Sequence, residues 1–96
     1  MDKSQIKHLK ALAHKLKPIV TVGQHGMKES INDEIAIALT FHQLLKIKIN
    51  LGDRGARDAL VTELTSKHKA ELIQRIGNVA ILYRRNFDKE NLLKKT

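Results

Sequence analysis

The apolar residues of this chain alternate between helical and strand spacing, and this alternation limits the possible folds more than any other feature. Apolar side chains recur every three or four residues in three segments, which predicts helices at 4–17, 28–43 and 57–68. Runs of β-branched residues or period-two alternation predict strands at 19–22, 45–50, 70–76 and 79–85. The resulting order, α-β-α-β-α-β-β, places the chain in the α/β class.

The connections between these segments predict a mixed four-stranded sheet with helices packed on it. Each β-α-β unit should be right-handed and should give a parallel pair of strands. Gly77 and Asn78 separate the last two segments, which indicates an antiparallel hairpin. We expect a single domain over 1–96, with a core at about 4–86 and a charged, frayed tail at 87–96.

Local signals predict where the helices begin and end. Ser4 is a candidate N-cap for the first helix, and Asp53 is a candidate cap for the third. Pro18 should end the first helix, because the residue before a proline is driven out of the helical region. The inner faces of the second and third helices extend to His42 and His68, so both histidines are expected at the edge of the core.

Several classes of chemistry have no matching residues in the sequence. The chain has no cysteine, which excludes disulfides and thiolate metal sites. Its five histidines show no metal-ligand spacing, so neither a metal nor a cofactor is expected. A Walker loop, a GxSxG elbow and a cysteine nucleophile are absent, and we expect no enzymatic activity. No signal peptide or long apolar span is visible, so a cytoplasmic location is expected.

The net charge of +8 at pH 7 favours a polyanionic partner, either nucleic acid or anionic lipid. The charge is segregated along the chain: residues 1–28 hold six lysines and one acid, whereas 29–44 hold three acids and no lysine or arginine. The first helix lacks Trp and Phe on its apolar stripe, which favours packing on the sheet over a membrane. Its candidate RNA-binding residues are Lys7, Lys10, Lys15 and Lys17.

The segment Gly23-Gln24-His25-Gly26 connects a predicted strand to a predicted helix. Two glycines three residues apart allow the backbone to approach another chain closely, and the amides that begin the next helix suit a phosphate. KH-type modules clamp the nucleic-acid backbone with a GXXG loop of this kind. The alternative is an ordinary tight turn. Lys28, just after the loop, is a further candidate.

Two other cationic pairs are candidate RNA contacts. Lys46 and Lys48 point the same way from one predicted strand, and Arg84 and Arg85 end the last strand. These residues either extend a surface that follows phosphates or protect strand edges against aggregation. The sequence leaves both interpretations open.

Taken in order, four of these segments resemble the YhbY family, the stand-alone bacterial form of the CRM (chloroplast RNA splicing and ribosome maturation) domain. The segments are 9–16, 18–26, 45–49 and 72–84, and the resemblance covers about residues 4–86. It implies an α/β fold similar to the C-terminal domain of the third bacterial initiation factor. It also implies RNA binding through the GXXG loop and nearby basic residues, and association with precursors of the large ribosomal subunit.

Carried over to this chain, the resemblance assigns Gly23 and Gly26 to the loop and Gln24 and His25 to its tip. Family loops often hold a basic residue between the glycines, whereas His25 supplies charge here only when it is protonated.

The expected function is therefore that of a non-catalytic, monomeric RNA-binding factor in large-subunit assembly. The alternatives are a ribosome adapter that docks through the apolar stripe of its first helix, a structured-RNA binder acting off the ribosome, an RNA-modifying enzyme or a DNA-binding protein.

Overall fold

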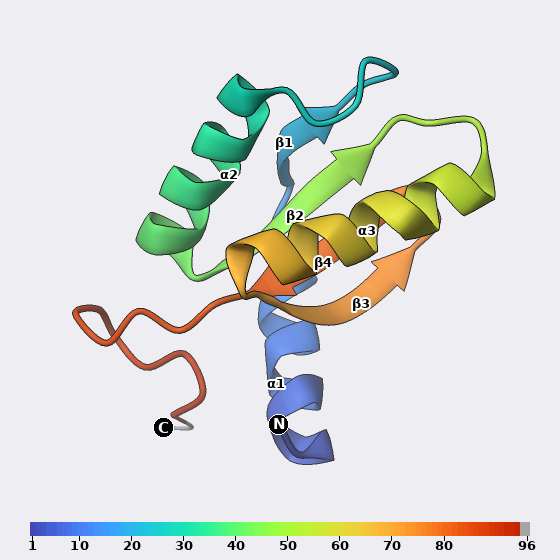
Figure 1. Ribbon diagram of the computed structural model, residues 1–96. Helices are drawn as coiled ribbons and strands as arrows, with labels where there is room; N and C mark the ends of the chain where they lie inside the picture. Colours follow the sequence, from blue (N-terminus) through green and yellow to red (C-terminus); the bar gives the residue numbers. More distant parts are fainter. Residues whose placement is uncertain (95–96) are drawn as a thin grey trace.

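The computed structural model describes residues 1–94, and this part of the chain forms three helices and four strands (Figure 1). Their order is the one that the sequence predicts. The elements are α1 (Lys3–Ala13), β1 (Pro18–Val22), α2 (Glu29–His42), β2 (Leu44–Ile49), α3 (Arg54–His68), β3 (Glu71–Ile76) and β4 (Val79–Tyr83).

The four strands form one mixed sheet in the order β1-β2-β4-β3, which confirms the predicted fold class. β1 and β2 are parallel, and β4 pairs antiparallel with both β2 and β3. The connection through α3 was expected to make β2 and β3 a parallel pair of neighbouring strands, and this prediction is wrong. The tight turn at Gly77 (φ 57°) returns the chain beside β3, and β4 then occupies the edge of β2 that β3 would have used.

Helices cover both faces of the sheet, with α2 and α3 on one face and α1 on the other (Figure 1). Alternation along β2 explains this division, because Leu45, Ile47 and Ile49 face α2 and α3 while Leu44 faces α1. The larger cluster of buried side chains comprises Val20, Val22, Ile35, Leu39, Leu45, Ile47, Ile49, Leu60, Val61, Leu64, Ala80 and Leu82. The smaller cluster, beneath α1, comprises Leu9, Ala13, Leu44, Ile73, Ile81 and Tyr83.

The ends of α1 differ from the prediction. Its N-cap is Asp2 and not Ser4: the amide of Gln5 donates to Asp2 Oδ1 at 2.8 Å, and the amide of Asp2 donates to Gln5 Oε1 at 3.1 Å. This reciprocal pair satisfies two of the amides that a helix start leaves without partners. The helix ends at Ala13, its last buried residue, and residues 14–17 carry the chain to β1. The other predicted cap is confirmed, because the amide of Ala56 donates to Asp53 Oδ2 at 2.9 Å.

The junction between α2 and β2 buries Gln43 and exposes His42, so the prediction of His42 at the core edge is wrong. Gln43 has a φ of 64°, and this sharp turn directs its side chain inward. Its Oε1 accepts from the amide of Asn86 at 2.9 Å, and its Nε2 donates to the carbonyl of Glu90 at 2.8 Å. One buried amide side chain thus joins the end of α2 to the C-terminal segment, residues 84–94.

The C-terminal segment packs against the domain as far as Leu93, whereas its charge alone predicts fraying. Leu92 and Leu93 are half-buried against the cluster beneath α1. The Nε2 atom of His8 lies 2.9 Å from the carbonyl oxygen of Leu92. Residues 95–96 of the predicted tail lie outside the described residues.

His68 is buried at the end of α3, as predicted, and its Nε2 lies 3.1 Å from Oδ1 of Asn32 on α2. Burial lowers the pKa of His68 below its ordinary value of 6.5, and the positive charges of Arg84 and Lys67 lower it further. The imidazole is therefore held in its neutral form at pH 7, where it links the two helices.

We expect acid to weaken the fold through His68. Its pKa is lower in the folded than in the unfolded chain, so the unfolded chain takes up more protons below pH 6.5. The contribution of His68 to the free energy of unfolding should be complete above about pH 6.5. It should decline as the pH falls towards the pKa of His68 in the folded chain. Urea unfolding at several pH values between 5 and 8 measures this decline. The decline should be smaller in His68→Gln, and an equal decline in both proteins would contradict the assignment to His68.

Candidate nucleic-acid interface

Three connections meet at one end of the sheet, which we call the loop end: residues 23–26, 50–53 and 77–78. The first two are visible at the upper right of Figure 1. The parallel pairing of β1 and β2 brings their carboxyl ends together, and the amide of Asn50 donates to the carbonyl of Val22 at 2.8 Å. The amide of Ile49 donates to the carbonyl of Asn78 at 2.6 Å and thereby adds the β3–β4 hairpin. Residues remote in sequence therefore share this end.

The segment Gly23–Gly26 forms a tight turn between β1 and α2. The amide of Gly26 donates to the carbonyl of Gly23 at 3.0 Å, and Gly26 has a φ of 73°. Lys28 is the N-cap of α2, and its side chain makes no capping hydrogen bond within the described residues. The first amides of α2 therefore receive no side-chain acceptor from their own cap, and such amides attract anions.

The two glycines of this loop have different reasons to lack a side chain. Gly26 needs its left-handed backbone for the turn. Gly23 does not have a left-handed φ, and a Cβ placed on it would have no atom within 4 Å. Nothing among the described residues therefore requires glycine at position 23. The open space at this position leaves room for another chain to approach the backbone, as the functional interpretation of the loop requires.

Lys46 and Lys48 lie on the face of the sheet that α1 partly covers, opposite α2 and α3. Lys48 is exposed, sits one residue before the end of β2, and pairs with Thr21 on β1. Lys48 and the glycine loop therefore lie at the same end of the same two strands. Lys46 is half-buried and pairs with Pro18, where β1 begins.

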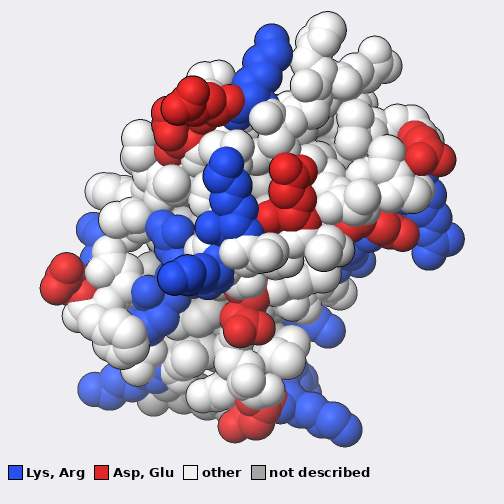
Figure 2. All heavy atoms as spheres, viewed as in Figure 1, with Lys and Arg blue, Asp and Glu red and all other residues white. Residues whose placement is uncertain are grey.

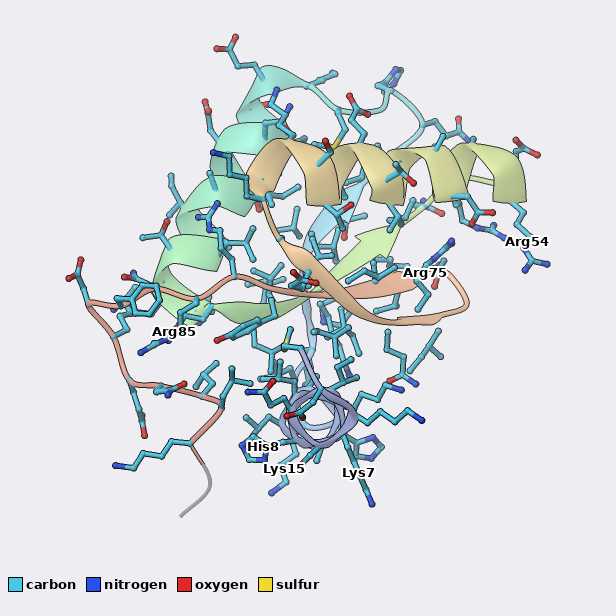
Figure 3. All side chains as sticks on the ribbon, turned by 60° about the horizontal axis from the view of Figure 1, so that its bottom comes forward. Lys7, His8, Lys15, Arg54, Arg75 and Arg85 are labelled. Carbon is cyan, nitrogen blue, oxygen red and sulfur yellow. The ribbon has the colours of Figure 1, made fainter. Side chains whose placement is uncertain are left out.

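The candidate lysines of the N-terminal region are all exposed, but they occupy two places. Lys7 and Lys10 belong to α1, which projects from the sheet on the side away from α2 and α3 (Figures 1 and 3). Lys15 and Lys17 lie in the connection to β1, and Lys17 directly precedes the residue that pairs with Lys46. Lys17 and Lys46 thus lie close together, while the lysines of α1 form a separate cationic region.

Arg84 and Arg85 lie at the opposite end of the sheet from the glycine loop, where β4 finishes. The guanidinium of Arg84 donates to the carbonyls of His68 and Ala36 and to Thr40 Oγ1, at 3.1, 3.0 and 2.9 Å. Arg85 donates to Gln43 Oε1 and to carbonyls of the C-terminal segment, at 2.9 to 3.2 Å. The structure therefore does not bring these two arginines together with the other candidates, and both connect elements of the fold.

Three arginines that the sequence analysis did not select lie at the loop end. Arg54 and Arg57 are one turn apart at the start of α3, and Arg75 lies on β3. They line a single pocket with Gly77 of the hairpin. The excess of basic residues in 45–57 is visible in the sequence. The approach of Arg75 is not, because it depends on the strand order.

The face formed by α2 and α3 carries charges of both signs, with Lys and Arg side chains gathered near its left centre and Asp and Glu side chains around them (Figure 2). This agrees with the three acids at residues 29–44. Among residues 1–94, no helix is long and apolar enough to cross a membrane, and no group of three side chains is arranged as a metal site.

Comparison with known proteins gives consistent matches along most of the chain. Residues 1–84 match the CRS1 / YhbY (CRM) domain. The chain is 37% identical over 86 residues to the probable RNA-binding protein PA4753 of Pseudomonas aeruginosa, covering 90% of this chain and 83% of that protein. It is 36% identical over 84 residues to an RNA-binding protein of Haemophilus influenzae, covering 88% and 85%.

A solved structure shows the same fold. The solution structure of the hypothetical protein SAV1595 from Staphylococcus aureus, described as a candidate RNA-binding protein, superposes with a TM-score of 0.78. The two chains are 29% identical, and the superposition covers 95% of this chain and 94% of that one.

Proposed function

Because the chain belongs to the CRS1 / YhbY (CRM) domain family, we propose that it is an RNA-binding protein that acts without catalysis. The observation that carries this proposal is Gly23, an open position at the loop end that no internal contact explains. Lys28 is the N-cap of α2, directly after the loop, and Lys48 on β2 pairs with Thr21 of β1, just before it. The names of the relatives from Pseudomonas and Haemophilus support RNA as the polyanion.

Recognition in this proposal depends mainly on the RNA backbone. Of the chain's three aromatic residues, Tyr83 is buried, and Phe41 and Phe87 lie away from the loop end. Stacking of bases on aromatic side chains is therefore a small contribution. Lysines and exposed amides bind phosphates without reading sequence, so affinity should fall as salt rises, with a slope of about 0.7–0.9 per phosphate contact.

We further propose that the RNA belongs to precursors of the large ribosomal subunit in the cytoplasm, and that the protein binds it as a monomer. The family resemblance supports this client, and the net charge of +8 is suited to a large RNA surface.

Sedimentation of a cell extract on sucrose gradients tests the client. The protein should comigrate with large-subunit precursors at low salt and should move to the top of the gradient at moderate salt, because counterions compete for the phosphates. Antibody detection across the fractions measures this shift. Protein found only at the top at both salt concentrations would contradict the ribosomal client and would direct the search to RNAs off the ribosome.

A ribosome adapter remains the second candidate because α1 leaves part of its apolar stripe uncovered. Leu12 of α1 and Leu16 in the connection to β1 are each 39% exposed. In the same gradients, an RNA-binding factor should be released by a Lys15→Ala and Lys17→Ala double variant and retained by Leu12→Ala. The opposite pattern, in a protein whose circular dichroism is unchanged, would favour the adapter.

A further inference from the structure

A basic pocket lies at the loop end between the start of α3 and the β3–β4 hairpin. Arg54, Arg57, Arg75 and Gly77 line it, and its volume is about 500 Å³. Figure 3 shows Arg54 and Arg75 on the same side of the molecule, with Arg85 on the other. The three arginines of the pocket lie on α3 and β3, outside both the glycine loop and β2.

The pocket retains positive charge after its internal pairs are counted. Arg75 forms a salt bridge with Asp58, one turn into α3. The hydrogen bond from Arg75 lowers the pKa of Asp58, burial opposes this, and the charges of Arg75, Arg54 and Arg57 lower it further. All three arginines therefore act on one carboxylate. Asp53, the second acid nearby, accepts from the amide of Ala56, which leaves three guanidinium groups against two carboxylates.

Arg57 has donors that the fold does not use. Its Nη1 donates to the carbonyl of Leu51 at 2.9 Å, which fixes the side chain beside the loop. Its Nε is buried, and within residues 1–94 it has no hydrogen-bond partner. A buried donor without an acceptor is costly, so Arg57 would gain from an acceptor that another molecule brings into the pocket.

We propose that this pocket binds a backbone phosphate of RNA, as a second contact separate from the glycine loop. The inference rests on the proposed RNA-binding function. Guanidinium groups suit this role, because their planar donors match pairs of phosphate oxygens. The positive end of α3, at Arg54, adds to the attraction.

The two contacts would engage different phosphates of one RNA. The glycine loop follows β1 and the pocket adjoins β3, and these are the two edge strands of the sheet. Three strand spacings separate them, or roughly 14 Å at about 4.8 Å each. This distance exceeds the size of one phosphate group, so the loop end would hold a stretch of backbone and not a single point.

The experiment compares Arg54→Gln with Lys67→Gln in binding to a structured RNA over a range of salt concentrations. Arg54 is exposed and makes no hydrogen bond through its side chain among those found in residues 1–94, so its replacement should not disturb the fold. Lys67 is an exposed cation in the last turn of the same helix and is the charge-matched control. Arg54→Gln should weaken binding by about tenfold, and its salt slope should fall by about 0.7–0.9. Lys67→Gln should keep the parent values.

A second measurement follows the Nε–Hε NMR signal of Arg57 during titration with the same RNA and, separately, with inorganic phosphate. The proposal expects the signal to shift with RNA. If the parent binds RNA with a salt-dependent affinity while Arg54→Gln behaves as Lys67→Gln does, the pocket assignment is overturned and the proposed function stands. A shift with inorganic phosphate and none with RNA would also overturn it. If the parent binds no RNA at any salt concentration, the proposed function itself fails.

Discussion

Replacing Gly23 with aspartate is expected to lower the affinity for structured RNA by about tenfold or more while the fold is retained. A Cβ at this position has no atom within 4 Å, and its backbone is not left-handed, so the side chain can be accommodated. The carboxylate would then repel phosphates at the start of α2 and would prevent a close approach to the backbone. Filter binding or fluorescence anisotropy measures the affinity, and circular dichroism and thermal unfolding verify the fold.

Two further variants make this test specific. Asn91→Asp adds the same charge in the C-terminal segment and keeps the Oδ1 atom that accepts from the amide of Leu93, so it should bind RNA as the parent does. Gly23→Lys adds a side chain of the opposite charge and so separates repulsion by charge from obstruction by size. If both Gly23 variants bind RNA weakly, the backbone itself must approach the RNA closely. Unchanged affinity in Gly23→Asp, with the fold intact, would reduce the loop to an ordinary turn. Gly26 is less suitable for this test because its φ of 73° would strain any other residue.

Replacing Arg84 with alanine is expected to lower the free energy of unfolding by about 2–4 kcal/mol. The half-buried guanidinium donates to two carbonyls and one hydroxyl on α2 and α3, and without it these acceptors lose their charged donor. The loss is a large fraction of the stability of a small domain. Urea unfolding followed by circular dichroism measures it.

Arg84→Lys should recover only part of this stability, because one ammonium group cannot reach three acceptors on two helices. Lys17→Ala, which removes an exposed cation, should unfold at nearly the same urea concentration as the parent. Arg84 was also a candidate RNA contact. If Arg84→Ala binds RNA normally at a temperature where it is folded, the residue serves the fold, whereas weak binding by a fully stable variant would restore it to the interface.

Local chemistry in the sequence predicted much of the fold because each signal acts over a few residues. Alternation at 45–50 correctly predicted the two faces of β2, and Gly77-Asn78 correctly predicted the final hairpin. The errors arose where a choice depended on distant partners. His42 continued the apolar spacing of its helix, but the left-handed turn at Gln43 left it exposed, and the amide of Gln43 took the buried position beside Asn86 and Glu90.

The candidate interface divides in the same way. The glycine loop and the lysines of β2 were identifiable because glycine spacing and strand alternation are local patterns. The pocket of Arg54, Arg57 and Arg75 was not, since it requires β4 to lie between β2 and β3 and thereby to bring the hairpin beside the start of α3.

The sequence by itself determined the kinds and order of the elements, the basic character of the chain and the position of the glycine loop. It did so because spacing, turn chemistry and charge are properties of neighbouring residues. Only the tertiary structure decided which cations share the loop end with Gly23 and which, like Arg84, are committed to holding helices together. That decision depends on strand order and on hydrogen bonds between residues up to 48 positions apart, which no local pattern encodes.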